Sequence, residues 1–181
     1  MKILIFGASG SGTTTLGKEL EKHTGFRHLD VDDYYWKPTK PPFIEKVPLD
    51  QRNANLIADL NKHKEAIVVG SMVSWGKYWE RIFDFAVFMY LDPAIRIKRL
   101  EKREFDRYGE SLYTDKQIQQ NSLKFLEWAK KYDDPNFLGR SITIHNNWIK
   151  KFDCPVLRID GGIELERKTE KVLNELKKYH K

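Results

Sequence analysis

The sequence has a single cysteine, Cys154, among its 181 residues. One cysteine excludes an intramolecular disulfide and fits a reducing compartment. Because Cys154 precedes a proline at the start of an expected strand, we interpret its thiol as a packed side chain and not as a nucleophile. The histidines, His23 and His145 among them, share no metal-ligand spacing with each other or with the cysteine, so the sequence offers no zinc site.

Long apolar runs are also missing. The longest ones, such as FDFAVFMYL, fall well short of the roughly 20 residues that a membrane-spanning helix needs. The chain begins with one lysine and a short apolar segment that no small-residue cleavage site follows, so we expect no secretory leader. These absences predict a cytoplasmic protein of one domain, without a membrane partner.

Charge of one sign is only in modest excess, since 32 Lys and Arg residues stand against 26 Asp and Glu for a net charge of +6. The basic residues lie mostly on helical segments interleaved with acids, as in ELERKTEKVLNELKK, which is typical of solvated helix faces. No RNA- or DNA-binding motif accompanies them. We therefore expect no nucleic-acid partner; such a partner would require an affinity that falls steeply with salt.

What the sequence does have is an alternation of strand-like and helix-like segments. Strands are expected at residues 2–6, 26–32, 66–70, 85–91 and 154–160, and helices near 13–23, 49–62, 114–131, 140–151 and 163–179, with a further helix that begins at Pro93. The alternation predicts an α/β fold of one domain over 1–181, a parallel sheet with helices on both faces. Spacing leaves the strand order open, and the proline-rich residues 37–48 are expected to form a loop inside the domain.

The segment GASGSGTTT stands between the first expected strand and an amphipathic helix. Its three glycines allow backbone N–H groups to curl around a phosphate, which also meets the positive end of the helix dipole. The hydroxyl of Thr14 is placed to ligate Mg²⁺. The predicted phosphate-binding residues are Gly7, Ser9, Gly10, Ser11, Gly12, Thr13, Thr14 and Thr15. The alternative is an ordinary tight turn between a strand and a helix; the glycine spacing does not fit a dinucleotide-binding fingerprint.

Thr13 stands where the phosphate-loop pattern G-x-x-x-x-G-K-[ST] has lysine. Phosphoryl transfer depends on positioning and electrostatic stabilisation, so an unreplaced loss of this charge would be severe. Lys18 is a poor substitute, because five residues further along a helix it lies about 7.5 Å beyond the phosphates and on another face. A working enzyme therefore needs a positive charge from elsewhere in the fold.

Arginines supply a candidate for that charge. Arg96, Arg99, Arg103 and Arg107 are spaced by three, four and four residues, which brings them near one face of a helix. The helix follows an apolar strand, and Tyr108–Gly109 after it is a plausible hinge for a mobile cover. The guanidinium fork suits phosphate oxygens. The alternative is an exposed helix whose ion pairs with the interleaved acids contribute little.

Three carboxylates, Asp30, Asp32 and Asp33, cluster where the second expected strand ends. Such carboxylates can hold Mg²⁺ through water or accept the proton of an attacking hydroxyl. Strand alternation predicts Asp30 and Asp32 on one side and Asp33 on the other. The alternative is helix capping or solvated loop charge.

Aromatic residues flank the same region. Trp36 follows the acidic cluster, and Trp75 follows the third expected strand. These side chains could stack on a planar acceptor, although packing of a loop onto the body is the commoner role of such residues. The predicted substrate-binding residues are Asp30, Asp33, Trp36 and Trp75.

The order of these motifs resembles that of the small P-loop metabolite kinases: nucleoside monophosphate kinases, shikimate kinase and gluconate kinase. GASGSGTTT resembles their phosphate loop and LDPAIRIKRLEKRE the entry into their arginine-bearing lid. HLDVDDYYW is similar to the acidic strand end of the shikimate and gluconate kinases, and VLRIDGG to the adenine-side loop. The lysine-free loop is similar to that of bacterial phosphoribulokinases, which are active kinases.

The resemblance implies a three-layer P-loop NTPase fold with five parallel strands in the order 2-3-1-4-5, and MgATP as phosphoryl donor. It also implies an acceptor-binding segment at about 32–63 and an arginine-bearing helical lid at about 99–140. The residues that match catalytic positions are Asp32, Arg99, Arg103 and Arg140, and those that match metal positions are Thr14 and Asp32. AIVVGSMVSWG lacks the Gly-Phe-Pro-Arg sequence of adenylate kinases, which disfavours AMP as the acceptor.

Two functions follow from these observations. The first is ATP-dependent phosphoryl transfer to a small acceptor, which is a nucleotide, a nucleoside or a hydroxylated metabolite. The alternative is a regulatory protein that binds ATP or ADP without turnover, in which Thr13 marks lost chemistry.

Overall fold

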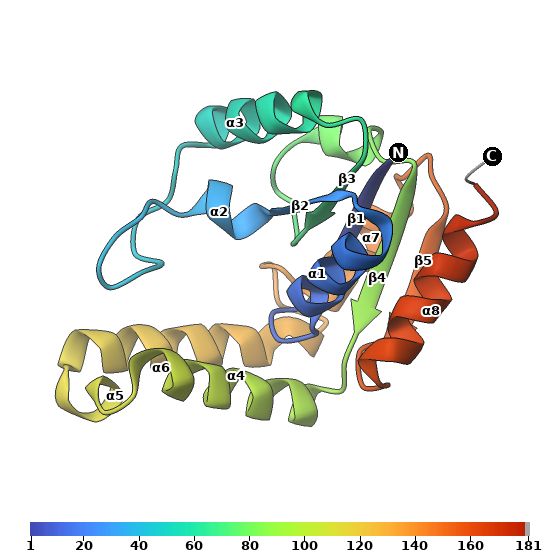
Figure 1. The fold of residues 1–181 in the computed structure, drawn as a ribbon. Helices are drawn as coiled ribbons and strands as arrows, with labels where there is room; N and C mark the ends of the chain where they lie inside the picture. The colour runs from blue at the N-terminus through green and yellow to red at the C-terminus, as the bar shows by residue number, and fades with distance from the viewer. Residues whose placement is uncertain (180–181) are drawn as a thin grey trace.

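Figure 1 shows the computed structural model of the chain, which describes residues 1–179. Its centre is a sheet of five parallel strands: β1 Lys2–Gly7, β2 Arg27–Asp30, β3 Ala66–Val69, β4 Phe85–Tyr90 and β5 Val156–Asp160. The strands lie in the order β2-β3-β1-β4-β5. This confirms the α/β fold and the strand order that the resemblance implied. Because all strands are parallel, the residues that follow them gather at one edge of the sheet.

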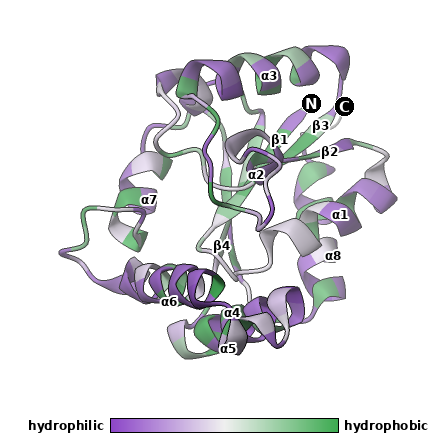
Figure 2. Ribbon diagram, turned by 90° about the vertical axis from the view of Figure 1, so that its left-hand side faces the viewer, coloured by the Kyte–Doolittle hydropathy of each residue, from purple (hydrophilic) through white to green (hydrophobic). Residues whose placement is uncertain are grey.

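The helices are α1 Thr13–Thr24, α2 Val31–Tyr35, α3 Leu49–Lys62, α4 Pro93–Tyr108, α5 Ser111–Thr114, α6 Lys116–Lys130, α7 Ile142–Ile149 and α8 Leu165–Leu176, with two 3₁₀ turns, η1 Lys77–Glu80 and η2 Lys131–Asp133. Helices α1 and α8 pack on one face of the sheet with Ile3 and Ile5. Helices α3 and α7 pack on the other face with Leu4 and Phe6. Both faces are covered, so the three inner strands β1, β3 and β4 are apolar without alternation, as their largely green colour in Figure 2 shows. The edge strands β2 and β5 carry charged residues as well.

Helices α4, α5 and α6 form an arm beside the carboxyl edge of the sheet (Figure 1). Arg96 of α4 is 1% exposed, and its guanidinium donates hydrogen bonds to the carbonyl oxygen of Ala129 and to the carboxylate of Asp133. These bonds tie α4 to the end of α6. Leu100 of α4 lies against Gly10, so the arm touches the loop that precedes α1.

The second strand is shorter than its sequence pattern predicts. β2 ends at Asp30, and the next residues begin α2, so the expected strand 26–32 is wrong at its end. The cause is local: the Asp30 carboxylate accepts a hydrogen bond from the backbone N–H of Asp32 at 3.0 Å and caps the helix. Strand alternation therefore does not decide the directions of Asp30 and Asp32. Residues 37–48 form the expected loop, with one antiparallel bridge between Trp36 and Lys46.

Candidate active site

The loop between β1 and α1 is shaped by two glycines. Gly10 has a φ of 85° and Gly12 a φ of 94°, in a region that favours glycine. Gly12 is the N-cap of α1, and no side chain caps this helix. The N–H groups of its first turn are therefore open to an anion, which the helix dipole also favours.

The space beside this loop suits a phosphate group. A Cβ atom on Gly12 would have no neighbour closer than Met89 Cε at 3.8 Å and Arg99 Nη1 at 4.0 Å. The buried hydroxyl of Ser11 has no hydrogen-bond partner within the described chain. An uncapped helix start, open space and a nearby guanidinium together fit an anionic ligand.

A cleft of about 1060 Å³ opens from this loop toward α2 and the arm. Fourteen of the predicted site residues line it: Gly7, Ser9, Gly10, Gly12, Thr13, Thr14, Thr15, Asp30, Asp32, Asp33, Trp36, Arg99, Arg103 and Arg140. The two that do not are Ser11, which is buried beneath the loop, and Trp75. Segments far apart in the chain thus share one cleft.

Asp32 presents a carboxylate to this cleft that no group in residues 1–179 holds by a hydrogen bond or an ion pair. The side chain is exposed to solvent at the cleft, yet the neighbouring walls desolvate its carboxylate in part, and Asp30 adds negative charge beside it. Both effects raise the pKa of Asp32, against the smaller opposing influence of Arg140 and Arg103. A carboxylate of raised pKa with no partner is suited to accept a proton.

Asp30 links the phosphate loop to α2. One carboxylate oxygen accepts a hydrogen bond from Thr14 Oγ1 at 3.1 Å, while the other caps α2. Thr14 and Asp30 therefore place two hard oxygen atoms at the mouth of the loop, of the kind that Mg²⁺ prefers. Asp33 also lines the cleft, and its pKa is raised by partial burial and by the charge of Asp30.

The structure divides the arginines of α4 by role. Arg96 serves the packing of the arm, whereas Arg99, Arg103 and Arg107 line the cleft. Arg99 donates a hydrogen bond to the carbonyl oxygen of Gly161 at 3.3 Å, beside the phosphate loop. Three arginines of one helix thus face the cleft, and the fourth holds that helix in place.

Two of these arginines rest on aromatic rings. The guanidinium of Arg103 lies 5.4 Å from the ring centre of Phe125, and burial lowers the pKa of Arg103. The guanidinium of Arg107 lies 4.5 Å from the ring centre of Phe43. The second contact joins the arm to the loop 37–48 across the cleft.

Arg140 comes from the segment between α6 and α7. Its guanidinium lies 5.0 Å from the ring centre of Trp128 and interacts with Asp32 by charge attraction. It makes no hydrogen bond to any residue of the described part. Burial lowers the pKa of Arg140, and Asp32 opposes that effect. An arginine held by a ring contact alone keeps its five N–H donors free for a ligand.

Lys168 is a positive charge that the sequence reasoning missed. It lies on α8 within a run of alternating charges that is typical of a solvated face, yet it is 7% exposed and lines the cleft. Its Nζ donates a hydrogen bond to Gly161 O at 3.2 Å, as Arg99 does. One sequence signal could have revealed it: Lys168 is three residues from Leu165 and four from Val172, a spacing that puts it on the apolar inner face of the helix.

The aromatic residues divide between lining and packing. Trp36 lines the cleft, together with Tyr35 and with Phe43, which the sequence did not single out. Trp75 is 2% exposed and packs in the core. The rings of Tyr35 and Trp75 stack with their centres 6.2 Å apart, and the guanidinium of Arg52 lies beside both, at 4.4 and 4.8 Å from the two ring centres. Trp75 thus supports the wall behind Tyr35.

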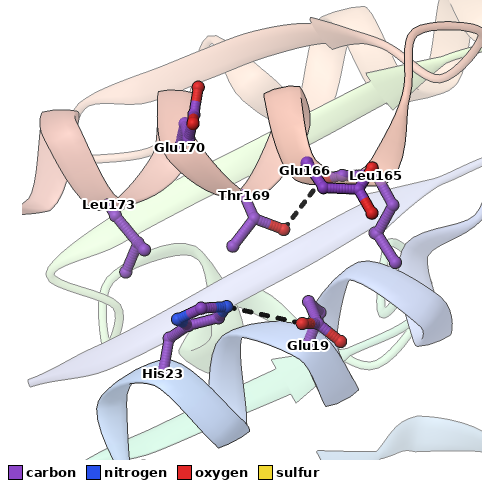
Figure 3. A pocket seen from close by; sticks show the side chains of 7 residues that line it. All are labelled: Glu19, His23, Leu165, Glu166, Thr169, Glu170 and Leu173. Carbon is purple, nitrogen blue, oxygen red and sulfur yellow. Dashed lines mark hydrogen bonds and ion pairs between the residues drawn. The ribbon is translucent and has the colours of Figure 1, made fainter.

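A second, smaller hollow of about 200 Å³ lies between α1 and α8 (Figure 3). His23 Nε2 lies 3.4 Å from Glu19 Oε1 there, and Thr169 donates a hydrogen bond to the carbonyl oxygen of Leu165. None of the predicted site residues lines this hollow. Among the residues that the structure describes, no three His, Cys, Asp or Glu side chains gather as a metal site.

Within residues 1–179, no helix has the length and apolar character needed to cross a membrane.

Comparisons with known proteins identify the family and the fold of the chain. Residues 3–121 match the family model described as AAA domain. The chain is 37% identical over 174 residues to the uncharacterized protein YqaC of Bacillus subtilis strain 168, with 96% of each chain covered. It is 29% identical over 119 residues to a cytidylate kinase of Archaeoglobus fulgidus, which covers 58% of this chain and 62% of that protein.

A similar solved structure is the shikimate kinase of Bacteroides thetaiotaomicron, with a TM-score of 0.57 at 13% identity and 98% of each chain covered. At that identity the likeness concerns the fold.

Proposed function

The chain belongs to the AAA domain family and has the fold of the small P-loop metabolite kinases, and on this premise we propose that it transfers a phosphoryl group from ATP to a hydroxyl of a small acceptor. The observation that carries the proposal is Asp32. Its carboxylate is free, has a raised pKa and shares a cleft with the phosphate loop and with Arg103 and Arg140. A base, a phosphate cradle and positive charge are the parts that phosphoryl transfer requires.

On the donor side, the N–H groups at the start of α1 would bind the phosphates of ATP. Thr14 with Asp30 and Asp32 would hold Mg²⁺, which would offset the negative charge of the phosphates when bound. The side chains fit such an ion, because Thr14 and Asp30 already place oxygen atoms 3.1 Å apart.

Positive charge that replaces the loop lysine would come from arginines. Arg103 and Arg140 interact with Asp32 by charge attraction. Arg99 and Lys168 both donate a hydrogen bond to the carbonyl oxygen of Gly161 beside the loop. We assign the transferring phosphoryl group to Arg103 and Arg140, since their guanidinium groups make no hydrogen bond in the described chain. The α4–α6 arm, with the proposed lid at about 99–140, would exclude water from these groups.

On the acceptor side, Asp32 would accept the proton of the attacking hydroxyl. The walls come from the segment 32–63 and carry the rings of Tyr35, Trp36 and Phe43. Flat aromatic walls favour a planar acceptor such as a nucleoside or nucleotide over a small sugar acid. Hydroxylated metabolites remain candidate acceptors and are included in the test below.

The test is acceptor-dependent ADP release from MgATP in a coupled assay, with pools of nucleotides, nucleosides and hydroxylated metabolites. We expect one pool to raise ADP release, and Asp32→Asn and Thr14→Ala to abolish that rise. Asp106→Asn is the matched control, because Asp106 is exposed on α4 and pairs with Lys102. Tight ATP binding with no pool active would contradict the kinase and support the regulatory alternative.

A further inference from the structure

A chain of hydrogen bonds runs from the cleft into the core through His145. The Nε2 atom of His145 lies 2.8 Å from Ser71 Oγ, and the Nδ1 atom lies 2.8 Å from the hydroxyl of Tyr132. Ser71 follows β3 and lines the cleft, whereas Tyr132 belongs to η2 and His145 to α7. Three segments far apart in sequence thus meet in one polar network.

The inner members of this network are buried. His145 is 0% and Tyr132 3% exposed. The imidazole packs edge-on against Phe6 and Phe88, with ring centres at 5.4 and 5.8 Å. Burial, with the nearby charge of Arg140, lowers the pKa of His145 to about 3, so the ring is neutral at physiological pH.

A neutral imidazole has one N–H donor and one acceptor nitrogen, so its two bonds run in a single direction. The phenol hydrogen of Tyr132 finds no acceptor other than His145 in residues 1–179. Buried donors are almost always satisfied in proteins, so the phenol donates to Nδ1 and the hydrogen of His145 lies on Nε2. That Nε2–H then donates to Ser71 Oγ, and the hydrogen of Ser71 itself is left for another partner.

The place of Ser71 defines that partner. β3 lies between β2 and β1, so Ser71 stands between the strand that ends in Asp30 and the strand that ends in the phosphate loop. We infer that Ser71 donates a hydrogen bond to an oxygen of the acceptor next to the hydroxyl that Asp32 deprotonates, with His145 and Tyr132 as the positioning residues. This inference rests on the proposed kinase activity.

The direction of the network is tested first, without nucleotide or acceptor. In ¹⁵N-histidine-labelled protein, long-range ¹H–¹⁵N spectra report which nitrogen of each ring carries the hydrogen, and variants of the other four histidines assign His145. We expect a neutral ring protonated on Nε2 from pH 5 to pH 8. Protonation on Nδ1 overturns the inference, because Ser71 would then donate to His145 and not to a ligand.

Kinetics test the consequence. Ser71→Ala is expected to lower kcat/KM for the acceptor about tenfold, as loss of one hydrogen bond to a bound group does. The Kd for ATP should stay unchanged, and Ser71→Thr, which keeps the hydroxyl, should retain activity. An alanine variant with the acceptor kinetics of the native protein overturns the inference and leaves the kinase in place. A native protein that no acceptor pool activates overturns the proposed function itself.

Tyr132→Phe provides a readout that packing alone would not move. Removal of the phenol hydrogen leaves Nδ1 without a donor, while the Nε2–H keeps Ser71 as its acceptor. We therefore expect the ring to stay protonated on Nε2, the ¹⁵N chemical shift of Nδ1 to move, and kcat/KM to fall. Tyr34→Phe is the matched control: it loses a hydrogen bond from a phenol to Asp59 at 2.8 Å, and Tyr34 does not line the cleft. A Tyr132→Phe protein in which the ¹⁵N chemical shift of Nδ1 is unchanged contradicts the argument.

Discussion

The two sides of the cleft are built in different ways. The phosphate side consists of backbone: Gly10 and Gly12 at positive φ and the uncapped start of α1, all within one short segment. The opposite side consists of side chains drawn from three distant segments: Asp32, proposed for the acceptor, and Arg103 and Arg140, proposed for the transferring phosphoryl group. A site made of backbone is a property of local sequence, whereas a site made of side chains exists only once the fold has formed.

This difference predicts separate losses on the two sides. Among the variants that compare the two sides, the largest effect is expected for Arg140→Ala, which removes a guanidinium that makes no hydrogen bond in the described chain and lies near Asp32. Loss of one such donor to developing charge lowers kcat by about 100- to 1000-fold. The Kd for ATP, measured by titration, should change little. Arg81→Ala is the control, since Arg81 is exposed and pairs with Asp153 at the surface. A large loss of ATP affinity in Arg140→Ala would break the division between the two sides.

Gly12→Ala should show the reverse pattern. At a φ of 94° an alanine is strained by about 1–2 kcal/mol, which corresponds to about a tenfold weaker binding of ATP if the loop shifts to relieve it. Gly76→Ala is the matched control, because Gly76 has a φ of 112°, open space around it and no place in the cleft. Equal ATP affinity in the two variants would show that the loop is not the phosphate cradle.

Phe43→Ala sharpens the acceptor side. It removes the ring that the guanidinium of Arg107 covers at 4.5 Å, and with it the contact between the arm and the loop 37–48. An exposed contact of this kind contributes about 0.5–1 kcal/mol, so KM for the acceptor should rise about two- to fivefold. Ile44→Ala, at the exposed neighbouring residue, should leave it unchanged. An unchanged KM in both variants would separate this contact from acceptor binding.

The smallest expected effect is on stability. Because the pKa of Asp32 is raised in the folded protein, the folded state binds more protons than the unfolded state between the ordinary and the raised value. The free energy of unfolding therefore falls as pH rises through that window, and above it the ionised carboxylate of Asp32 destabilises the folded state. We expect Asp32→Asn to raise Tm slightly at pH 7, with no gain at a pH below both values. Asp106→Asn should give no such gain, and a lower Tm for Asp32→Asn at pH 7 would contradict the assignment.

The same contrast explains what the sequence could predict. The glycine spacing of the phosphate loop and the apolar runs of β1, β3 and β4 are local signals, and the structure has these elements where the pattern placed them. The end of β2 was misjudged, because Asp30 serves as a helix cap and apolar alternation carries no sign of that.

Residues that join the cleft through tertiary contacts left no local signal. Lys168 occurs in a charged run, and only the packing of α8 buries its stem while its amine reaches Gly161. His145 lies far along the chain from Ser71, so their hydrogen bond follows from the fold alone. Trp75 was predicted to stack on a substrate, yet it packs in the core. An aromatic residue in the sequence does not tell whether its ring lines the cleft or packs behind a residue that does.

The hydrogen bond from Thr14 to Asp30 has a consequence for the order in which ligands bind. Asp30 caps α2, the helix that carries Asp32 into the cleft. One residue therefore touches both the loop that we propose for the donor and the start of the segment that we propose for the acceptor. A ligand that draws the Thr14 hydroxyl away alters the surroundings of that cap. The affinities for the two substrates are then thermodynamically linked, and each must change the other by the same factor.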